Sequence, residues 1–145
     1  MFEFTAASQD DFERLVVLRI ATMRESLQRI GRFDEQRARE RFRGSFKPSQ
    51  TRLIMVDGAV AGCVALGPHD AGLLLEHFYI APAKQGRGLG SAVLLRLLAE
   101  AAASGLPIRL GVLRASDAER FYRRHGFVMT GEDEWDIYYE WRPHP

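Results

Sequence analysis

Apolar and polar residues follow one another along this chain with two different spacings, which together predict four helices and seven strands. Between Ser8 and Gly31, apolar residues recur every three or four positions, as in a helix with one buried face. This apolar face consists of Phe12, Val16, Ile20, Met23, Leu27 and Ile30. Ser8 with Asp11 three residues later resembles a capping box, which predicts that the helix begins there.

A second helix is predicted from the capping residue Asp34 to about Arg43. It is very polar, and only Ala38 and Phe42 are expected to face inward. Its mixed charges are typical of a solvated helix face with ion pairs between residues four positions apart. The alternative is a basic patch that binds an acidic acceptor.

Strands are predicted where short apolar or alternating runs lie between turn residues. The expected strands are residues 2–5, 51–56, 60–66, 73–80, 108–113, 127–130 and 135–141. A tight turn at Asp57-Gly58-Ala59 is expected to join the second and third strands, and residues 67–70 are expected to form a loop. A short helix is predicted from a capping box of Ser116 and Glu119 to Arg124.

The stretch from residue 73 to 103 reads as a buried strand, a glycine-rich loop and a helix. Ala81-Pro82 ends the strand, and from Leu89 the apolar residues fall at helical spacing. The first amides of a helix have no partner within it, and three glycines in residues 86–90 let the backbone approach a ligand closely. The pattern favours an anion site, most naturally for a pyrophosphate, to which Arg87 could add charge. The plainer alternative is a turn that packs a helix on a strand.

Two common phosphate-binding motifs are excluded in this loop. A P-loop requires a lysine directly after its last glycine, and no lysine follows a glycine here. The dinucleotide-binding fingerprint has the spacing G-x-G-x-x-G in the first βαβ unit, whereas this loop has G-x-G-x-G and about half the chain precedes it.

The loop Gln85-Gly86-Arg87-Gly88-Leu89-Gly90 resembles that of the GNAT family of N-acetyltransferases. The family loop begins with Arg or Gln, has Gly three residues later, and ends with Gly or Ala after one further residue. Residues 118–127, AERFYRRHGF, resemble a second family segment, Ala-x-x-Phe-Tyr-x-x-x-Gly-Phe. The resemblance covers residues 51–130 well, and the first fifty residues only by architecture.

This resemblance implies a fold and a cofactor. The predicted element order is that of the family, an α+β fold in which a mixed, mostly antiparallel sheet is flanked by helices on both faces. It also implies acetyl-CoA as acetyl donor, with pyrophosphate on the loop amides, pantetheine along the strand ending at Ile80, and a backbone amide there stabilising the oxyanion. The residues expected to bind it are Phe78, Tyr79, Ile80, Gln85, Gly86, Arg87, Gly88, Leu89, Gly90 and Ser91.

Tyr122 occupies the tyrosine position of the second segment and is the predicted acid, because a phenol can protonate a leaving thiolate. The alternative is a helix tyrosine that only packs on the core. The family often has Asn seven residues earlier, where this chain has Ala115 next to Ser116, so that side-chain contact with the cofactor is in doubt.

Glu76 is the predicted base, with an exposed or ion-paired strand glutamate as the alternative. Strand periodicity puts Glu76 and Phe78 on one face and His77 and Tyr79 on the other, so only one of Glu76 and His77 should reach the amine. His125, at a helix end, is more simply stabilised by the helix dipole.

The acceptor amine is expected between the first two helices, the central strand and the last hairpin. The residues predicted to line this pocket, together with Glu76, are Arg19, Arg24, Trp135, Asp136 and Tyr138. They would suit a small amine with a carboxylate or another polar group. Arg19 lies near the middle of the first helix's apolar stripe, so a snorkelling side chain is its alternative interpretation.

Composition sets broader limits. The 145 residues, 46% of them hydrophobic and 27% charged, are expected to form one domain, residues 1–145 with a tail at 142–145. Cys63 is the single cysteine and resembles a small strand hydrophobe, which fits a reducing compartment. With no signal peptide or membrane-spanning run, we expect a cytoplasmic protein without a membrane partner. No residue spacing indicates a metal.

The leading hypothesis is direct acetyl transfer from acetyl-CoA to a primary amine of a small molecule. Acetylation of a protein N-terminus or lysine is an alternative, and a non-catalytic acyl-CoA-binding module is another. No nucleic-acid partner is expected, and a homodimer is left open.

Overall fold

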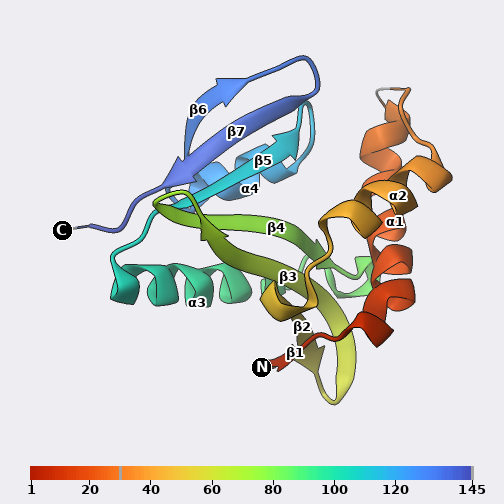
Figure 1. The fold of residues 1–145 in the computed structure, drawn as a ribbon, viewed down its shortest axis with the longest axis horizontal. Coiled ribbons are helices and arrows are strands. Elements are labelled where there is room, and N and C mark those ends of the chain that lie inside the picture. Colours follow the sequence, from red (N-terminus) through yellow and green to blue (C-terminus); the bar gives the residue numbers. More distant parts are fainter. Residues whose placement is uncertain (30, 145) are drawn as a thin grey trace. The chain divides into compact units, whose positions relative to one another are not determined.

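The computed structural model describes residues 1–29 and 31–144, apart from the Ser26 side chain, and contains the elements in the predicted order (Figure 1). Ile30 of the predicted helical face and Pro145 of the predicted tail lie outside the described residues. The helices are α1 (Phe12–Arg29), α2 (Glu35–Ser45), α3 (Leu89–Ser104) and α4 (Ala118–Arg124). The strands are β1 (Phe2–Ala6), β2 (Thr51–Val56), β3 (Ala59–His69), β4 (Gly72–Ile80), β5 (Ile108–Leu113), β6 (Val128–Glu132) and β7 (Asp136–Trp141).

The seven strands have the order β1-β2-β3-β4-β5-β7-β6 in one mixed sheet. Four neighbouring pairs are antiparallel, β1 with β2, β2 with β3, β5 with β7 and β6 with β7, whereas β4 and β5 are parallel. The parallel pair is joined through α3, as a crossover connection requires. This arrangement confirms the expected α+β fold class.

The described residues group into two compact units, one within Met1–Ala65 and His77–Gly90 apart from residue 30, and the other within Leu66–Glu76 and residues 91–144. The expected assignment of residues 1–145 to one domain stays a prediction.

In the first unit, α1 and α2 lie side by side (Figure 1) and pack on β2 and β3. The Asp34 carboxylate accepts a hydrogen bond from the Arg37 amide at 3.0 Å, which confirms the predicted start of α2. Ala38 and Phe42 are buried as expected. One hydrophobic core cluster of this unit contains Phe12, Leu15, Val16, Ile20, Ala38, Phe42, Phe46, Leu53 and Cys63.

The start of α1 differs slightly from the prediction. The Asp11 carboxylate accepts from the Ser8 amide at 2.8 Å, but a 3-10 turn at Gln9–Asp11 precedes the α-helix, which begins at Phe12. Between β2 and β3, Asp57 and Gly58 both have positive φ, 51° and 79°, which is the backbone of the tight hairpin turn expected there.

In the second unit, β5 pairs with β7 from Ile108 opposite Trp141 to Leu113 opposite Asp136, and α4 contacts β5. The apolar stripe of α3 is buried at Val93, Leu94, Leu97, Leu98 and Ala101, as its spacing predicts.

Several boundary predictions are wrong. Residues 67–69 continue β3 instead of forming a loop, and the turn comes at Asp70, whose φ is 50°. Pro68 is tolerated there because a strand position with no ladder hydrogen bond to donate can hold proline. β6 begins at Val128 rather than at residue 127 and extends to Glu132, and β7 begins at Asp136, which leaves Trp135 before the strand.

Candidate functional site

The glycine-rich loop lies between the end of β4 and the start of α3. A 3-10 turn at Pro82–Lys84 follows the strand, and the Gln85 side-chain amide donates to the Ile80 carbonyl at 2.8 Å. Gly86 and Gly88 have φ of 77° and 81°, in the left-handed region that favours glycine. The predicted loop geometry is therefore present, and Ser91 lies in the first turn of α3.

Open space lies at the Cβ positions of the two glycines with positive φ in this loop. A Cβ atom placed on Gly86 or Gly88 would meet no atom within 4 Å, so their backbone conformation, and not packing, requires glycine there. Residues 85–88, including Arg87, are exposed. The loop before α3 is thus exposed to solvent, and the helix dipole favours an anion at that end.

The strand before the loop approaches β3 unusually closely. A Cβ atom on Gly62 would collide with the Tyr79 carbonyl oxygen and lie 3.2 Å from the Ile80 Cα. The Ala81 amide donates to the Ala61 carbonyl at 2.8 Å, and the Cys63 thiol donates to the His77 carbonyl at 3.2 Å. This close pairing holds Tyr79 and Ile80, two of the residues predicted to lie along the cofactor.

His77 interrupts the regular geometry of β4. Its φ is 51°, which is unusual for a residue other than glycine inside a strand and indicates a local kink. His77 and Tyr79 nevertheless share a face, because the His77 Nδ1 atom lies 3.2 Å from the Tyr79 hydroxyl. Strand periodicity predicted this shared face correctly.

Arg19 of α1 reaches the same two β4 side chains. Its Nη1 atom donates to the Tyr79 hydroxyl at 2.6 Å and lies 3.5 Å from His77 Nδ1. Only 9% of Arg19 is exposed, so the residue does not snorkel to the surface. Arg24, also predicted for the acceptor pocket, is exposed, with its guanidinium 4.6 Å from the centre of the Phe33 ring.

Ser45, at the end of α2, completes this cluster and was not predicted. Its hydroxyl oxygen lies 2.8 Å from His77 Nε2, and the His77 ring packs edge-on against Phe42. Nothing in the local sequence around Ser45 signals this contact, because its partner is 32 positions away in the sequence.

Burial is the main reason that the pKa of His77 falls to about 4, and the nearby Arg19 charge lowers it further. With both ring nitrogens engaged, His77 is a poor candidate for the base. The Glu76 side chain is partly buried and its role as the base stays a prediction. Burial also raises the pKa of the Cys63 thiol to about 12, which agrees with a structural role for this cysteine.

The depressed pKa of His77 predicts a stability change in mild acid. The unfolded chain should take up a proton near pH 6.5, whereas the folded protein takes it up only near pH 4, so stability is fully present above pH 6.5 and decreases below it. His77 alone should lower the free energy of unfolding by about 3 kcal/mol between these two pH values. Urea unfolding across this range measures the effect.

His77→Asn is the matched control, because asparagine tolerates positive φ and does not titrate. Its unfolding free energy should depend less on pH than that of the wild type between pH 6.5 and 4. Equal pH dependence in both proteins would show that His77 is not responsible.

Tyr122 is 7% exposed and lies in α4 of the second unit. Its ring packs edge-to-face against Phe127 and Phe121, with centroids 5.3 Å and 5.1 Å apart. The position of Tyr122 in the family segment is therefore accompanied by the expected helix, and its role as the acid stays a prediction. His125 ends this helix as expected, with its Nδ1 atom 2.8 Å from the Phe121 carbonyl.

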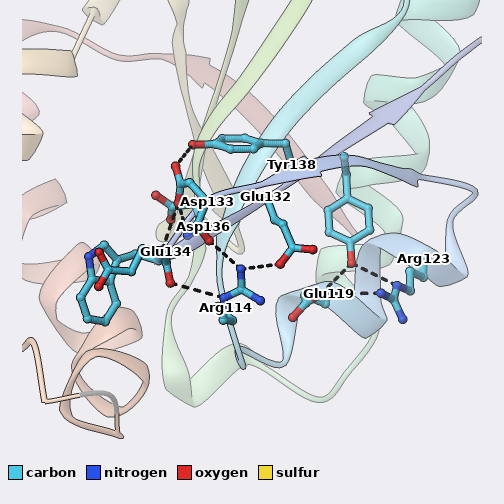
Figure 2. A network of polar contacts seen from close by, with 10 residues as sticks. Arg114, Glu119, Arg123, Glu132, Asp133, Glu134, Asp136 and Tyr138 are labelled. Carbon is cyan, nitrogen blue, oxygen red and sulfur yellow. Dashed lines mark hydrogen bonds and ion pairs between the residues drawn. The ribbon is translucent and has the colours of Figure 1, made fainter.

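The predicted capping box before α4 is absent. Glu119 instead accepts a hydrogen bond from the buried Tyr139 hydroxyl at 2.7 Å, and Arg123 donates to that hydroxyl at 3.0 Å (Figure 2). The N-cap is Asp117, and the Ser116 hydroxyl is buried with no hydrogen-bond partner among the described residues. Glu119 therefore bonds to Tyr139, which is distant in sequence, instead of forming the predicted capping box with Ser116.

Tyr138 and Asp136 belong to a polar network in the β6–β7 hairpin (Figure 2). Asp133 is its centre: one carboxylate oxygen accepts from the Trp135 and Asp136 amides, and the other accepts from the Tyr138 hydroxyl at 2.6 Å. Arg114 donates to the Asp133 carbonyl at 2.6 Å. The Tyr138 hydroxyl is therefore already engaged in holding the hairpin, and the acceptor-binding role of these residues stays a prediction.

Metal-binding clusters and membrane-spanning helices are both absent from the described part of the chain. Within residues 1–29 and 31–144, no three His, Cys, Asp or Glu side chains gather where they could hold a metal ion. In the same residues, no helix has both the length and the apolar character needed to cross a bilayer.

Comparison with known proteins places this chain in a family. The family model described as an acetyltransferase (GNAT) domain matches residues 48–129. Among solved structures, the PaiA N-acetyltransferase from Thermoplasma acidophilum in complex with coenzyme A has a TM-score of 0.80 and 18% identity, over 98% of this chain and 99% of that chain.

Two further structures share the fold. The ribosomal-protein-S18-alanine N-acetyltransferase from Escherichia coli has a TM-score of 0.71 and 17% identity, over 98% of this chain and 94% of that chain. The N-acetylglutamate synthase from Neisseria gonorrhoeae, complexed with coenzyme A and N-acetyl-glutamate, has a TM-score of 0.66 and 18% identity, over 100% of this chain and 36% of that chain. A search of curated proteins found no match. The family model spans more than half of the chain and includes both the glycine-rich loop and Tyr122, so this protein belongs to the GNAT family of acetyltransferases.

Proposed function

We propose that this protein transfers the acetyl group of acetyl-CoA directly to a primary amine of a small molecule. The observation that carries the proposal is the exposed loop at the start of α3, where Gly86 and Gly88 have positive φ and open space at their Cβ positions. Coenzyme A in the structures of the PaiA N-acetyltransferase and N-acetylglutamate synthase supports the same choice of donor.

The residues present suit this donor. The amides of residues 86–91 would hold the pyrophosphate, with Arg87 adding positive charge, and the backbone of residues 78–80 would lie along the pantetheine. Bound acetyl-CoA supplies the thioester. Its acetyl carbon forms a bond to the amine nitrogen while the carbon–sulfur bond breaks.

Two side chains would move the protons of this reaction. Glu76, directly or through water, would take a proton from the amine, which must be neutral to attack. Tyr122 would donate its hydroxyl proton to the departing thiolate, and an amide near Phe78 would stabilise the oxyanion. No step requires an acetylated side chain, and the buried Cys63 thiol is unsuited to one.

The acceptor class is the finer part of the proposal. The named relatives of this fold include an enzyme for a protein alanine and one complexed with N-acetyl-glutamate, so the fold by itself accommodates both kinds of acceptor. A small molecule is favoured by the buried guanidinium of Arg19, which offers one charged contact in a confined position. We infer a cytoplasmic location from the single free cysteine.

An acceptor screen tests the reaction class. Release of the coenzyme A thiol should be slow with acetyl-CoA alone and should accelerate with at least one member of a small-amine panel, with acetylated product identified by mass spectrometry. Acetylation of peptides but not of small amines would favour the protein-acceptor alternative. Donor binding without acetylation of any acceptor would favour a non-catalytic acyl-CoA-binding module.

The donor site is tested by Gly88→Val. A β-branched side chain disfavours a φ of 81° and would occupy the open space beside the loop amides, so it should obstruct the pyrophosphate. We expect coenzyme A to bind at least about tenfold more weakly, which corresponds to about 1.4 kcal/mol. Isothermal titration calorimetry on the folded variant measures this.

Gly105→Val is the matched control, because Gly105 also has a positive φ, 69°, and open space at its Cβ position, but lies after α3. It should show similar backbone strain and wild-type affinity for coenzyme A. Unchanged affinity in Gly88→Val would remove the loop from the donor site.

A further inference from the structure

We propose that Arg19 recognises a carboxylate on the acetyl acceptor, so that the acceptors are amino acids or other amines that carry a carboxylate. This inference rests on the proposed acetyl transfer and specifies its substrate class. It is drawn from the charge and hydrogen bonding of the cluster formed by Arg19, Ser45, His77 and Tyr79, which is called the Arg19 cluster below.

Arg19 is a buried charge that has no ion-pair partner in the described part of the chain. Only 9% of the residue is exposed, and among residues 1–29 and 31–144 its side chain makes no ion pair. Arg39, whose side chain is more exposed, does bond a carboxylate, that of Glu13, at 2.8 Å. Because buried charges are ordinarily paired, an unpaired guanidinium marks a place where an anion is expected to bind.

The donor and acceptor roles within the Arg19 cluster can be assigned from the Ser45 hydroxyl onward. The Ser45 hydroxyl donates to the Arg41 carbonyl at 3.0 Å, so its oxygen is left to accept the Nε2 proton of His77. His77 Nδ1 is then a bare acceptor, which receives the Tyr79 hydroxyl proton. The Tyr79 oxygen in turn accepts from Arg19 Nη1.

Among the described residues, no carboxylate pairs with Arg19. Its hydrogen-bonding partners are the Tyr79 phenol and the His77 imidazole, and the proximity of Arg19 further disfavours protonation of His77. Arg19 Nε is buried and has no hydrogen-bond partner among the described residues. An unsatisfied buried donor is destabilising unless a ligand completes it.

The Nε and Nη2 side of the Arg19 guanidinium has the geometry needed to bind a carboxylate. Nη1 is bonded to Tyr79, and the described part of the chain supplies no hydrogen bond to Nε or Nη2. These two nitrogens form one side of the planar guanidinium, which binds both oxygens of a carboxylate in parallel. The bond to Tyr79 holds the guanidinium in place, so little side-chain freedom would be lost on binding.

The Arg19 cluster is not completely buried. His77 and Tyr79 are only partly buried, and the loop that binds the donor in our proposal begins a few residues after Tyr79. An acceptor held by its carboxylate at Arg19 would therefore lie beside the same strand, β4, whose end is proposed to carry the thioester.

Nuclear magnetic resonance of the arginine side chains tests the site without relying on catalysis. The Nε–H resonance of Arg19 in the wild-type protein would be assigned by its absence in Arg19→Lys. The probes are the N-acetyl derivatives of the common amino acids, which resemble products, and their carboxamides, each added to protein saturated with coenzyme A. At least one acid should shift the Arg19 resonance saturably, and its carboxamide should not.

The other arginine Nε–H resonances serve as internal controls, since a general effect of ionic strength would move exposed arginines as well. If no acid in the panel moves the Arg19 resonance, or if acid and carboxamide move it equally, the proposed carboxylate site is overturned.

Kinetics with matched acceptors give a second readout. For an amino acid that the wild type acetylates, kcat/KM should exceed that of the corresponding amino acid amide by at least about tenfold. Arg19→Met should lose this preference mainly through a higher KM, Arg19→Lys should retain part of it, and coenzyme A affinity should stay unchanged in both. If Arg19→Met unfolds, the proposal is tested by Arg19→Lys and by the wild-type comparison of the amino acid with its amide.

The outcomes separate this inference from the function on which it rests. Acetylation of amines without a preference for the acid, or with the preference intact in Arg19→Met, overturns the inference while the acetyltransferase proposal stands. A carboxylate-specific shift of Arg19 without acetylation of any amine supports the carboxylate site and counts against the proposed reaction.

Discussion

Tyr122→Phe is expected to slow acetyl transfer by at least about tenfold, with acetyl-CoA affinity and stability nearly unchanged. The substitution retains the ring, which packs against Phe121 and Phe127, and removes only the hydroxyl. A well-placed acid contributes roughly 10² to 10⁴-fold to a proton transfer, and its contribution appears in the transition state rather than in the bound substrate.

The expected loss in rate is smaller than this full contribution because the leaving thiolate depends only partly on a proton donor. Thiols have a reference pKa of about 8.5, so the thiolate can depart unprotonated, although with less driving force than a protonated thiol. Product release could hide a slower chemical step in kcat, and single-turnover measurements avoid this. Rates within about twofold of the wild type would remove Tyr122 from the mechanism and leave water as the proton source.

Tyr139→Phe is the matched control for this experiment. It also removes one phenol hydroxyl in the same unit, and that hydroxyl donates to Glu119 and accepts from Arg123. Its loss should therefore lower the free energy of unfolding, by about 1 to 3 kcal/mol, because Glu119 and Arg123 lose a shared partner. Transfer should remain close to the wild-type rate.

Gly62→Ala is expected to destabilise the protein by about 2 to 4 kcal/mol, although it adds a single methyl group. That methyl would collide with the Tyr79 carbonyl and approach the Ile80 Cα to 3.2 Å. Both obstacles are backbone atoms, which cannot move aside as a side chain would. Relief requires β3 and β4 to separate, which strains the hydrogen bond from Ala81 to Ala61.

Urea unfolding measures this effect, and Gly44→Ala provides a control with the same chemical change. Gly44 lies within α2, where a Cβ atom would meet nothing within 4 Å, so alanine there should stabilise the helix by up to about 1 kcal/mol. If the two variants have the same stability, the close contact of Gly62 with β4 is not a constraint. Because β4 leads into the glycine-rich loop, Gly62→Ala should also weaken coenzyme A binding.

Features set by short-range interactions were predictable from the sequence alone. The Asp34 cap, the turn at Asp57-Gly58 and the beginning of α3 at Leu89 each depend on residues within one or two turns of chain. The glycine loop belongs to the same class, since the positive φ of Gly86 and Gly88 follows from residue type and spacing. For this reason the element order and the family were accessible from the sequence.

Features that depend on competition between distant partners were decided by the tertiary structure. Ser116 and Glu119 have the spacing of a capping box, but the Glu119 carboxylate instead accepts a hydrogen bond from the buried Tyr139 hydroxyl. Periodicity placed Arg19 on an apolar stripe without indicating that Tyr79, sixty positions away, holds its guanidinium. The kink at His77 likewise carries no signal in the strand itself. A local pattern states which contacts a residue can make, whereas the packing of distant segments determines which of these contacts is the most favourable.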